Sequence, residues 1–150
     1  SEFYEVVNDG LQEKLGCILF QMHPRMEFTS ERLEQIVQSL DSNFTNVVEF
    51  RHASWWNPEV EQALREKNIT FCSISYPSLP DNVIKTSDTI YYRFHGVPEL
   101  YRSPYSEDFM KHIKDEINAR ESIREAYIYF NNDIDASAIT NAKQLQVMVD

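Results

Sequence analysis

Charged side chains interrupt two short apolar segments of this chain. The segment Val47–Arg51 carries Glu49 and Arg51 among apolar residues, and Arg93 and His95 stand in a similar setting further along. A charge is costly to bury unless it is paired, so such groups indicate chemistry, ligand binding or a structural ion-pair network. Arginine suits small anions, because its guanidinium group donates paired hydrogen bonds to a phosphate or carboxylate. A histidine, with an ordinary pKa of about 6.5, can transfer protons near neutral pH.

Strands and helices are predicted to alternate along the chain. Apolar runs between turn residues predict the strands Gly16–Met22, Val47–Arg51, Ile69–Ser75, Ile90–His95 and Ala126–Asn131. Apolar stripes at helical spacing predict helices in 3–15 and after the cap residues Thr29 or Ser30, Asn57, Ser106 and Asp135, with no clear helix in 76–89. This order implies parallel strands with helices outside, in a doubly wound sheet or a barrel. The chain has three glycines and no Gly-rich phosphate loop after a strand, which disfavours a nucleotide-binding wound sheet.

The strands can be oriented by requiring an apolar outer face against the helices of a barrel. This rule places Cys72 and Ile74 of the third strand outward. It turns towards the lumen a set of side chains that becomes more polar at the carboxyl ends of the strands: Gln21, Glu49, Arg51, Ser75, Arg93, His95 and Asn131. Parallel α/β barrels have their active sites at that end, so we expect these side chains to form one cationic pocket.

Roles within this pocket follow from the side-chain types. Glu49 and His95 are the candidates for proton transfer, and the remaining candidates would bind or orient a substrate: Gln21, Arg51, Trp55, Arg93, Tyr101, Tyr105 and Asn131. Structural alternatives remain open for them. The charged residues can form a buried ion-pair network that sets strand register, Trp55 can pack over the barrel rim, and the tyrosines can anchor a loop.

Composition narrows the function classes. The formal net charge of −10 disfavours nucleic acid and anionic membranes as partners, and no segment is long and apolar enough to span a bilayer. No spacing typical of a metal site and no Ser-His-Asp order is present, and no cofactor is indicated. Cys17 and Cys72 fall inside predicted strands, which favours buried thiols and a cytoplasmic location over a disulfide framework. No shift in composition marks a domain boundary, so residues 1–150 are expected to form a single domain.

Three functions fit these observations. The first is an enzyme, a lyase, isomerase or hydrolase that acts on a small anionic, for instance phosphorylated, substrate. The second is a non-catalytic module that binds an anion in the same pocket. The third, which the acidic charge disfavours most, is nucleic-acid processing with Trp55 and the tyrosines stacking on bases.

Several motifs together resemble a known family. They are Gly16–Gln21, Val48–His52 followed by Ser54–Trp55, Tyr92–Gly96 with Tyr101 and Tyr105, and Tyr129–Asn132 with Asn141–Ala142. In combination, and over nearly the whole chain, they resemble the YecE-like family, labelled domain of unknown function 72. The resemblance implies a TIM-type (β/α) barrel and no established activity. His23 stands where the family usually has proline.

The family barrel begins well before the segment that corresponds to residue 1. The resemblance therefore implies that this chain corresponds to the C-terminal portion of the barrel, about five parallel strands with outer helices, without the N-terminal strands. Five strands do not close such a barrel. The edges at Gly16–Met22 and Ala126–Asn131 are then unpaired, so we expect an open sheet or association with another chain through these edges.

Overall fold

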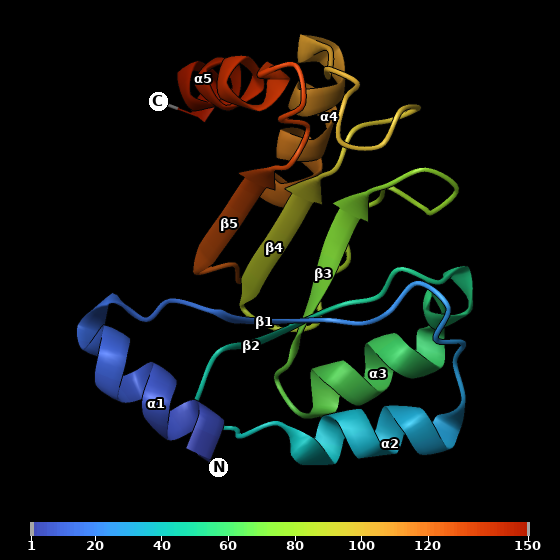
Figure 1. Ribbon diagram of the computed structural model, residues 1–150, viewed down its shortest axis with the longest axis vertical. Helices are drawn as coiled ribbons and strands as arrows, with labels where there is room; N and C mark the ends of the chain where they lie inside the picture. The colour runs from blue at the N-terminus through green and yellow to red at the C-terminus, as the bar shows by residue number, and fades with distance from the viewer. Residues whose placement is uncertain (1, 150) are drawn as a thin grey trace.

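The computed structural model describes residues 2–149, which form a five-stranded parallel sheet curved into a half-barrel (Figure 1). The strands lie in chain order: β1 (Ile18–Gln21), β2 (Asn46–Glu49), β3 (Thr70–Ser75), β4 (Thr89–Phe94) and β5 (Glu125–Phe130). β1 and β5 are the two edges of this sheet. The predicted α/β architecture of a partial TIM-type barrel with outer helices is confirmed.

The helices begin close to where the capping residues predict. They are α1 (Glu2–Leu11), the 3-10 turn η1 (Gln12–Lys14), α2 (Ser30–Ser39), the 3-10 turn η2 (Ala53–Trp55), α3 (Pro58–Glu66), α4 (Glu107–Asn118) and α5 (Ser137–Val149). Side chains of Thr29, Asn57 and Ser106 accept backbone N–H groups at the starts of α2, α3 and α4. The expected cap Asp135 is wrong, because its carboxylate pairs with Arg102 and α5 begins two residues later.

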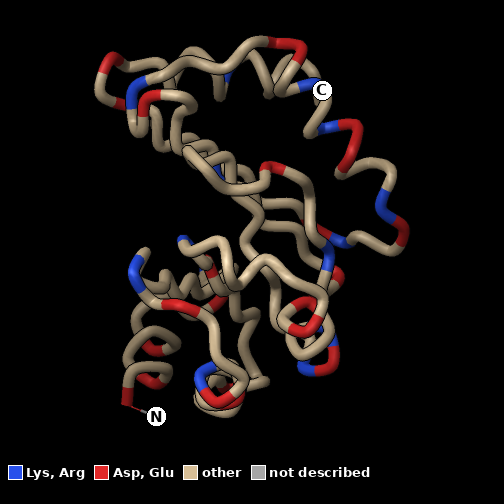
Figure 2. Tube along the Cα trace, turned by 90° about the vertical axis from the view of Figure 1, so that its right-hand side faces the viewer, with Lys and Arg blue, Asp and Glu red and all other residues tan. Residues whose placement is uncertain are grey.

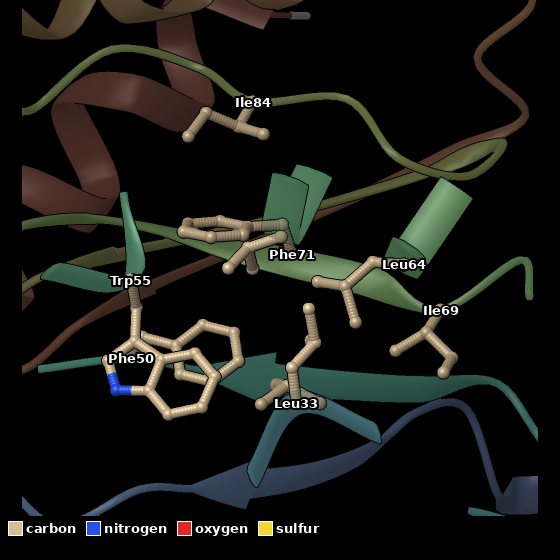
Figure 3. Close-up of a cluster of buried hydrophobic side chains, with 9 residues drawn as sticks. Leu33, Phe50, Trp55, Leu64, Ile69, Phe71 and Ile84 are labelled. Carbon is tan, nitrogen blue, oxygen red and sulfur yellow. The ribbon is translucent and has the colours of Figure 1, made fainter. Parts of the chain in front are cut away.

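Apolar residues pack the helices against the convex face of the sheet. α2 and α3 cover β2 and β3 through a cluster that includes Leu33, Phe50 and Leu64 (Figure 3). α4 and α5 cover β4 and β5 through a second cluster that includes Tyr92, Met110 and Leu145. Among the described residues, none of the helices has the length and apolarity that crossing a membrane requires. Because these helices pack on the convex face, the side chains of the concave face are available to form the site.

The predicted orientation of β3 is wrong. Cys72 and Ile74 lie on the concave face in a cluster with Val47 and Tyr91, whereas Phe71 joins the convex cluster. Ser73, placed in the lumen by the sequence, lies on the convex face, where its Oγ accepts the N–H of Ile84 at 2.8 Å. Segment 76–88 crosses this part of the sheet without a helix, and its Ile84 offers a backbone N–H. Small hydroxyl side chains therefore suit the convex face here, and the rule of an apolar outer face fails.

The predicted position of Ser75 in the lumen is wrong for the same reason. Its Oγ accepts the hydroxyl of Tyr105 at 2.9 Å on the convex side, so Ser75 does not belong to the polar set in the lumen. The other four strands have the predicted orientation. Leu19, Tyr91 and Tyr127 face the lumen, and Ile128 packs outside.

Candidate functional site

The carboxylate of Glu49 lies at the centre of the site. Glu49 is the last residue of β2 and is fully buried. Arg51 Nε donates to Glu49 Oε1 at 2.6 Å, and Arg93 Nη1, from β4, donates to Oε2 at 2.5 Å. The two guanidinium groups therefore lie on the same side of the sheet, as the pattern predicts, and they share one carboxylate.

Neutral side chains from other strands and loops complete the contacts of the two guanidinium groups. Gln21 Oε1, at the end of β1, accepts from Arg51 Nη2 at 2.8 Å and from Arg93 Nη1 at 3.2 Å. Asn131 Oδ1, which follows β5, accepts from Arg93 Nε at 3.1 Å. Tyr101 Oη, from the loop after β4, accepts from Arg51 Nη1 at 3.2 Å. Four strands and one loop thus contribute to a single cluster.

Several hydrogen-bond donors of this cluster have no acceptor in the part of the chain that the structure describes. Because a guanidinium group only donates, the amide oxygens of Gln21 and Asn131 have to face the arginines. Their amide nitrogens, the hydroxyl proton of Tyr101 and Arg93 Nη2 have no hydrogen-bond partner among residues 2–149. Arg51 and Arg93 retain side-chain exposures of 10% and 14%, so the donors lie at the solvent-facing mouth of the half-barrel.

The site is cationic inside an acidic protein. Burial opposes ionisation of Glu49, yet the contacts with His95, Arg93 and Arg51 lower the pKa of its carboxyl group from 4.5 to about 2. Glu49 is therefore ionised at neutral pH, and two guanidinium groups against one carboxylate leave one net positive charge. Over the whole chain Asp and Glu outnumber Lys and Arg by 24 to 14, and the acidic residues are spread over the helices and loops (Figure 2).

His95 lies beside this cluster without a hydrogen bond of its own. The ring is fully buried, Nε2 is 3.5 Å from Glu49 Oε1, and neither ring nitrogen has a hydrogen-bond partner among the described residues. Burial lowers the pKa of His95 below 6.5 and outweighs the nearby carboxylate of Glu49, which by itself would raise that pKa. The imidazole is therefore neutral at neutral pH. Tyr76 and Tyr101 contact the ring edge-on, with centroids 5.6 and 5.9 Å away. Unsatisfied buried polar atoms are rare in folded proteins and are a feature of functional sites.

Trp55 lies away from the arginines, which corrects its assignment as a substrate contact, and Tyr105 packs on the convex side beside Phe94. Trp55 is fully buried on the convex side, stacked on Phe50 at 4.4 Å, and its Nε1 donates to the carbonyl of Met26 (Figure 3). A ligand cannot reach it without unpacking this cluster. Tyr105 is 8% exposed, and its hydroxyl oxygen accepts the N–H of Gly96, which anchors the loop after β4.

Two residues that contact the cluster are not among the candidates that the sequence suggests. The guanidinium carbon of Arg51 lies 5.4 Å from the ring centre of Tyr76, and Cys72 Sγ lies 3.7 Å from Glu49 Oε2. The wrong orientation of β3 hid both residues, because Tyr76 follows Ser75 directly. Burial raises the pKa of Cys72 well above 9.0, so this thiol is not a nucleophile at neutral pH. Within residues 2–149 no three His, Cys, Asp or Glu side chains are grouped so as to hold a metal ion.

Fold and site together define a parallel α/β half-barrel with a cationic cluster at the carboxyl ends of its strands. The chain belongs to the DUF72 family, whose model, described as a protein of unknown function, matches residues 1–150. The structure is similar to a DUF72 family protein of Thermotoga maritima, with 30% identity and a TM-score of 0.87. It also has the fold of a DUF72 family protein of Enterococcus faecalis, with 18% identity and a TM-score of 0.84.

The chain is shorter than these relatives. The two matches include 99% and 98% of this chain. They include 64% of the Thermotoga chain and 63% of the Enterococcus chain. None of the curated proteins matches it.

Proposed function

We propose that the site binds a small oxyanion at the mouth of the half-barrel. The observation that carries this proposal is the surplus of donors. The acceptor oxygens of Glu49, Gln21 and Asn131 all accept from guanidinium groups, while unpartnered N–H and O–H groups remain at the mouth. An oxyanion offers several acceptors and a negative charge, and both match what the protein leaves unsatisfied.

In the enzymatic form of this proposal, His95 transfers a proton to or from the bound anion's neighbouring atoms. A neutral imidazole near the anion is a competent base, whereas Glu49, with a pKa of about 2, is a weak one. Glu49 then holds the two guanidinium groups in place. Gln21, Asn131 and Tyr101 orient the substrate through their remaining donors. The alternative is a module that binds the anion without turnover.

Replacing Arg93 tests anion binding. Arg93→Gln removes one of the two guanidinium groups and leaves Glu49 paired with Arg51, so we expect the dissociation constant for inorganic phosphate, measured by calorimetry, to rise at least about tenfold. Arg93→Lys keeps the charge but loses the planar fork and is expected to lie in between. The control is Arg124→Gln, an exposed arginine that precedes β5 at the opposite ends of the strands. Equal phosphate affinity in wild type and Arg93→Gln would refute the proposal.

We also propose that this chain associates through the edges of its sheet. β1 and β5 each have one neighbouring strand within the described residues, and Tyr129 of β5 is 46% exposed. A free strand edge is a template for pairing. The mass in solution is therefore expected to rise with concentration, and Tyr129→Lys is expected to shift it towards the monomer, unlike Ile139→Lys on the exposed face of α5. A monomer at every concentration would contradict this.

Two further expectations belong to the proposal. A cytoplasmic location is supported by Cys17 and Cys72, which are both free thiols. Nucleic acid is disfavoured as a partner, since the net charge of −10 leaves one small cationic cluster to attract a polyanion.

A further inference from the structure

A cavity lies near the cationic cluster. It has a volume of about 400 Å³ and lies between the loop after β3 and the loop after β4, the segments that extend beyond these two strands in Figure 1. Its wall combines aromatic and aliphatic residues with polar ones. The first group is Tyr76, Leu79, Val97, Pro104, Tyr105 and Phe109, and the second is Ser75, Ser78, Asp81 and Ser106. This volume is in the range of small-molecule sites.

Tyr76 joins this cavity to the cluster. Tyr76 is one of the residues that line the cavity, and its ring lies 5.4 Å from the guanidinium carbon of Arg51 and 5.6 Å from the ring of His95. An anion held by Arg51 would therefore lie close to Tyr76, which is part of the cavity wall.

The charges of the cavity limit what it can hold. Of the described residues, Asp81 is the only charged one in the lining, and no lysine or arginine among them contributes. A second anionic group would meet this carboxylate without a compensating cation, so an uncharged body fits here. Aromatic walls favour a ring, which packs on Tyr76, Tyr105 or Phe109.

The donors at the mouth favour phosphate as the anionic group. Unpartnered donors come from Gln21, Arg93, Tyr101 and Asn131, on three strand ends and one loop. A carboxylate has two oxygens, whereas a phosphomonoester has three terminal oxygens to receive donors from separate directions.

We propose that the ligand of this site is a phosphomonoester with an uncharged, ring-containing body, which lies against Tyr76 in the cavity between the two loops. This inference rests on the proposed oxyanion site and adds the class of substrate. The arginines bind the phosphate, and the cavity selects the body.

The test compares inorganic phosphate with phenyl phosphate. Burying a phenyl ring in an apolar cavity is expected to make phenyl phosphate bind at least about tenfold more tightly than inorganic phosphate in calorimetry. Val97→Trp narrows the cavity from a residue that is 40% exposed, so the core is left intact. It should abolish the advantage of phenyl phosphate and leave the affinity for inorganic phosphate within about twofold. The matched control is Val147→Trp on α5, where the side chain is 80% exposed and lies outside the cavity.

The outcomes separate the two proposals. Equal affinity for the two ligands in wild type, or an advantage of phenyl phosphate that survives Val97→Trp, would overturn the inference while the oxyanion site stands. Phenyl phosphate binding that is unchanged in Arg93→Gln would also overturn it, because ring and phosphate would then bind separately. If neither ligand binds, the oxyanion site itself fails and the inference with it.

Discussion

Glu49→Gln is expected to lower the free energy of unfolding by about 3–5 kcal/mol, the usual cost of removing one partner from a buried ion pair. The substitution keeps the shape of the side chain but leaves Arg51 and Arg93 without their shared counter-charge. Urea denaturation followed by fluorescence measures the loss. Sulfate in the buffer should restore part of it, because an oxyanion then takes over the missing negative charge.

The control for Glu49→Gln is Glu61→Gln, which removes a partly exposed ion pair, 3.7 Å from Glu61 Oε2 to Arg65 Nη2. Such a surface pair contributes less than about 1 kcal/mol. A loss of the same small size in Glu49→Gln would show that the buried network contributes little.

Acid should remove the difference between wild type and Glu49→Gln. The pKa of Glu49 is about 2 in the folded protein and 4.5 ordinarily, so its contribution is complete above pH 4.5 and is lost as the pH falls towards 2. The gap between the two unfolding free energies is therefore expected to shrink over this range. A gap that stays constant from pH 6 to pH 2 would contradict the assigned ionisation.

His95→Gln is expected to lower turnover of a phosphorylated substrate by about 10²- to 10⁴-fold, the usual contribution of a general acid or base. A panel of phosphomonoesters supplies the substrate. Folding should be kept, because neither ring nitrogen makes a hydrogen bond that the substitution would break. Phosphate affinity should also be kept, since the arginines retain their partners. The rate should fall only below pH 6.5, where the lowered pKa of His95 places protonation of the base.

His112→Gln is the matched control, since His112 lies exposed on α4, 3.5 Å from Glu116. Turnover that is equal in His95→Gln and wild type would exclude His95 as the proton-transfer group. Phosphate binding without turnover of any member of the panel would select the binding module over the enzyme.

The cluster shows how much of the site can be predicted from the alternation of side chains along strands. Alternation along β2 and β4 is enough to place Glu49, Arg51 and Arg93 on one face, because successive side chains of a strand point to opposite sides. The parallel order then brings β2 and β4 to the same end of the sheet, with β3 between them. Their convergence was therefore predictable from spacing alone.

The same reasoning failed for β3 because it assumed a helix outside every strand. Segment 76–88 covers β3 instead. The N–H of its Ile84 donates to Ser73 Oγ, while Thr86 Oγ1 accepts the N–H of Phe71 and donates to the carbonyl of Ile69. Serine is then the better residue outside, and the apolar Ile74 fills the lumen. Hydropathy cannot distinguish these two arrangements without the identity of the covering segment.

The prediction that Trp55 lies at the mouth failed for a different reason. Trp55 and Tyr101 both follow strand ends, so both were candidates for the mouth. The 3-10 turn η2 carries Trp55 onto the convex cluster, whereas the loop after β4 returns Tyr101 to Arg51. Loop paths depend on distant packing partners, which the local sequence does not specify.

The amino-acid sequence by itself determined the parallel α/β architecture, the capped helices and the shared face of the two arginines, because these depend on periodicity and on residues close in the chain. Only the tertiary structure decided that the amide oxygens of Gln21 and Asn131 face guanidinium groups, that His95 is left without a hydrogen bond, and that Tyr76 is close to both the cluster and a neighbouring cavity. These features depend on contacts between residues up to 72 positions apart, such as Gln21 and Arg93, and such contacts follow from packing rather than from any local pattern.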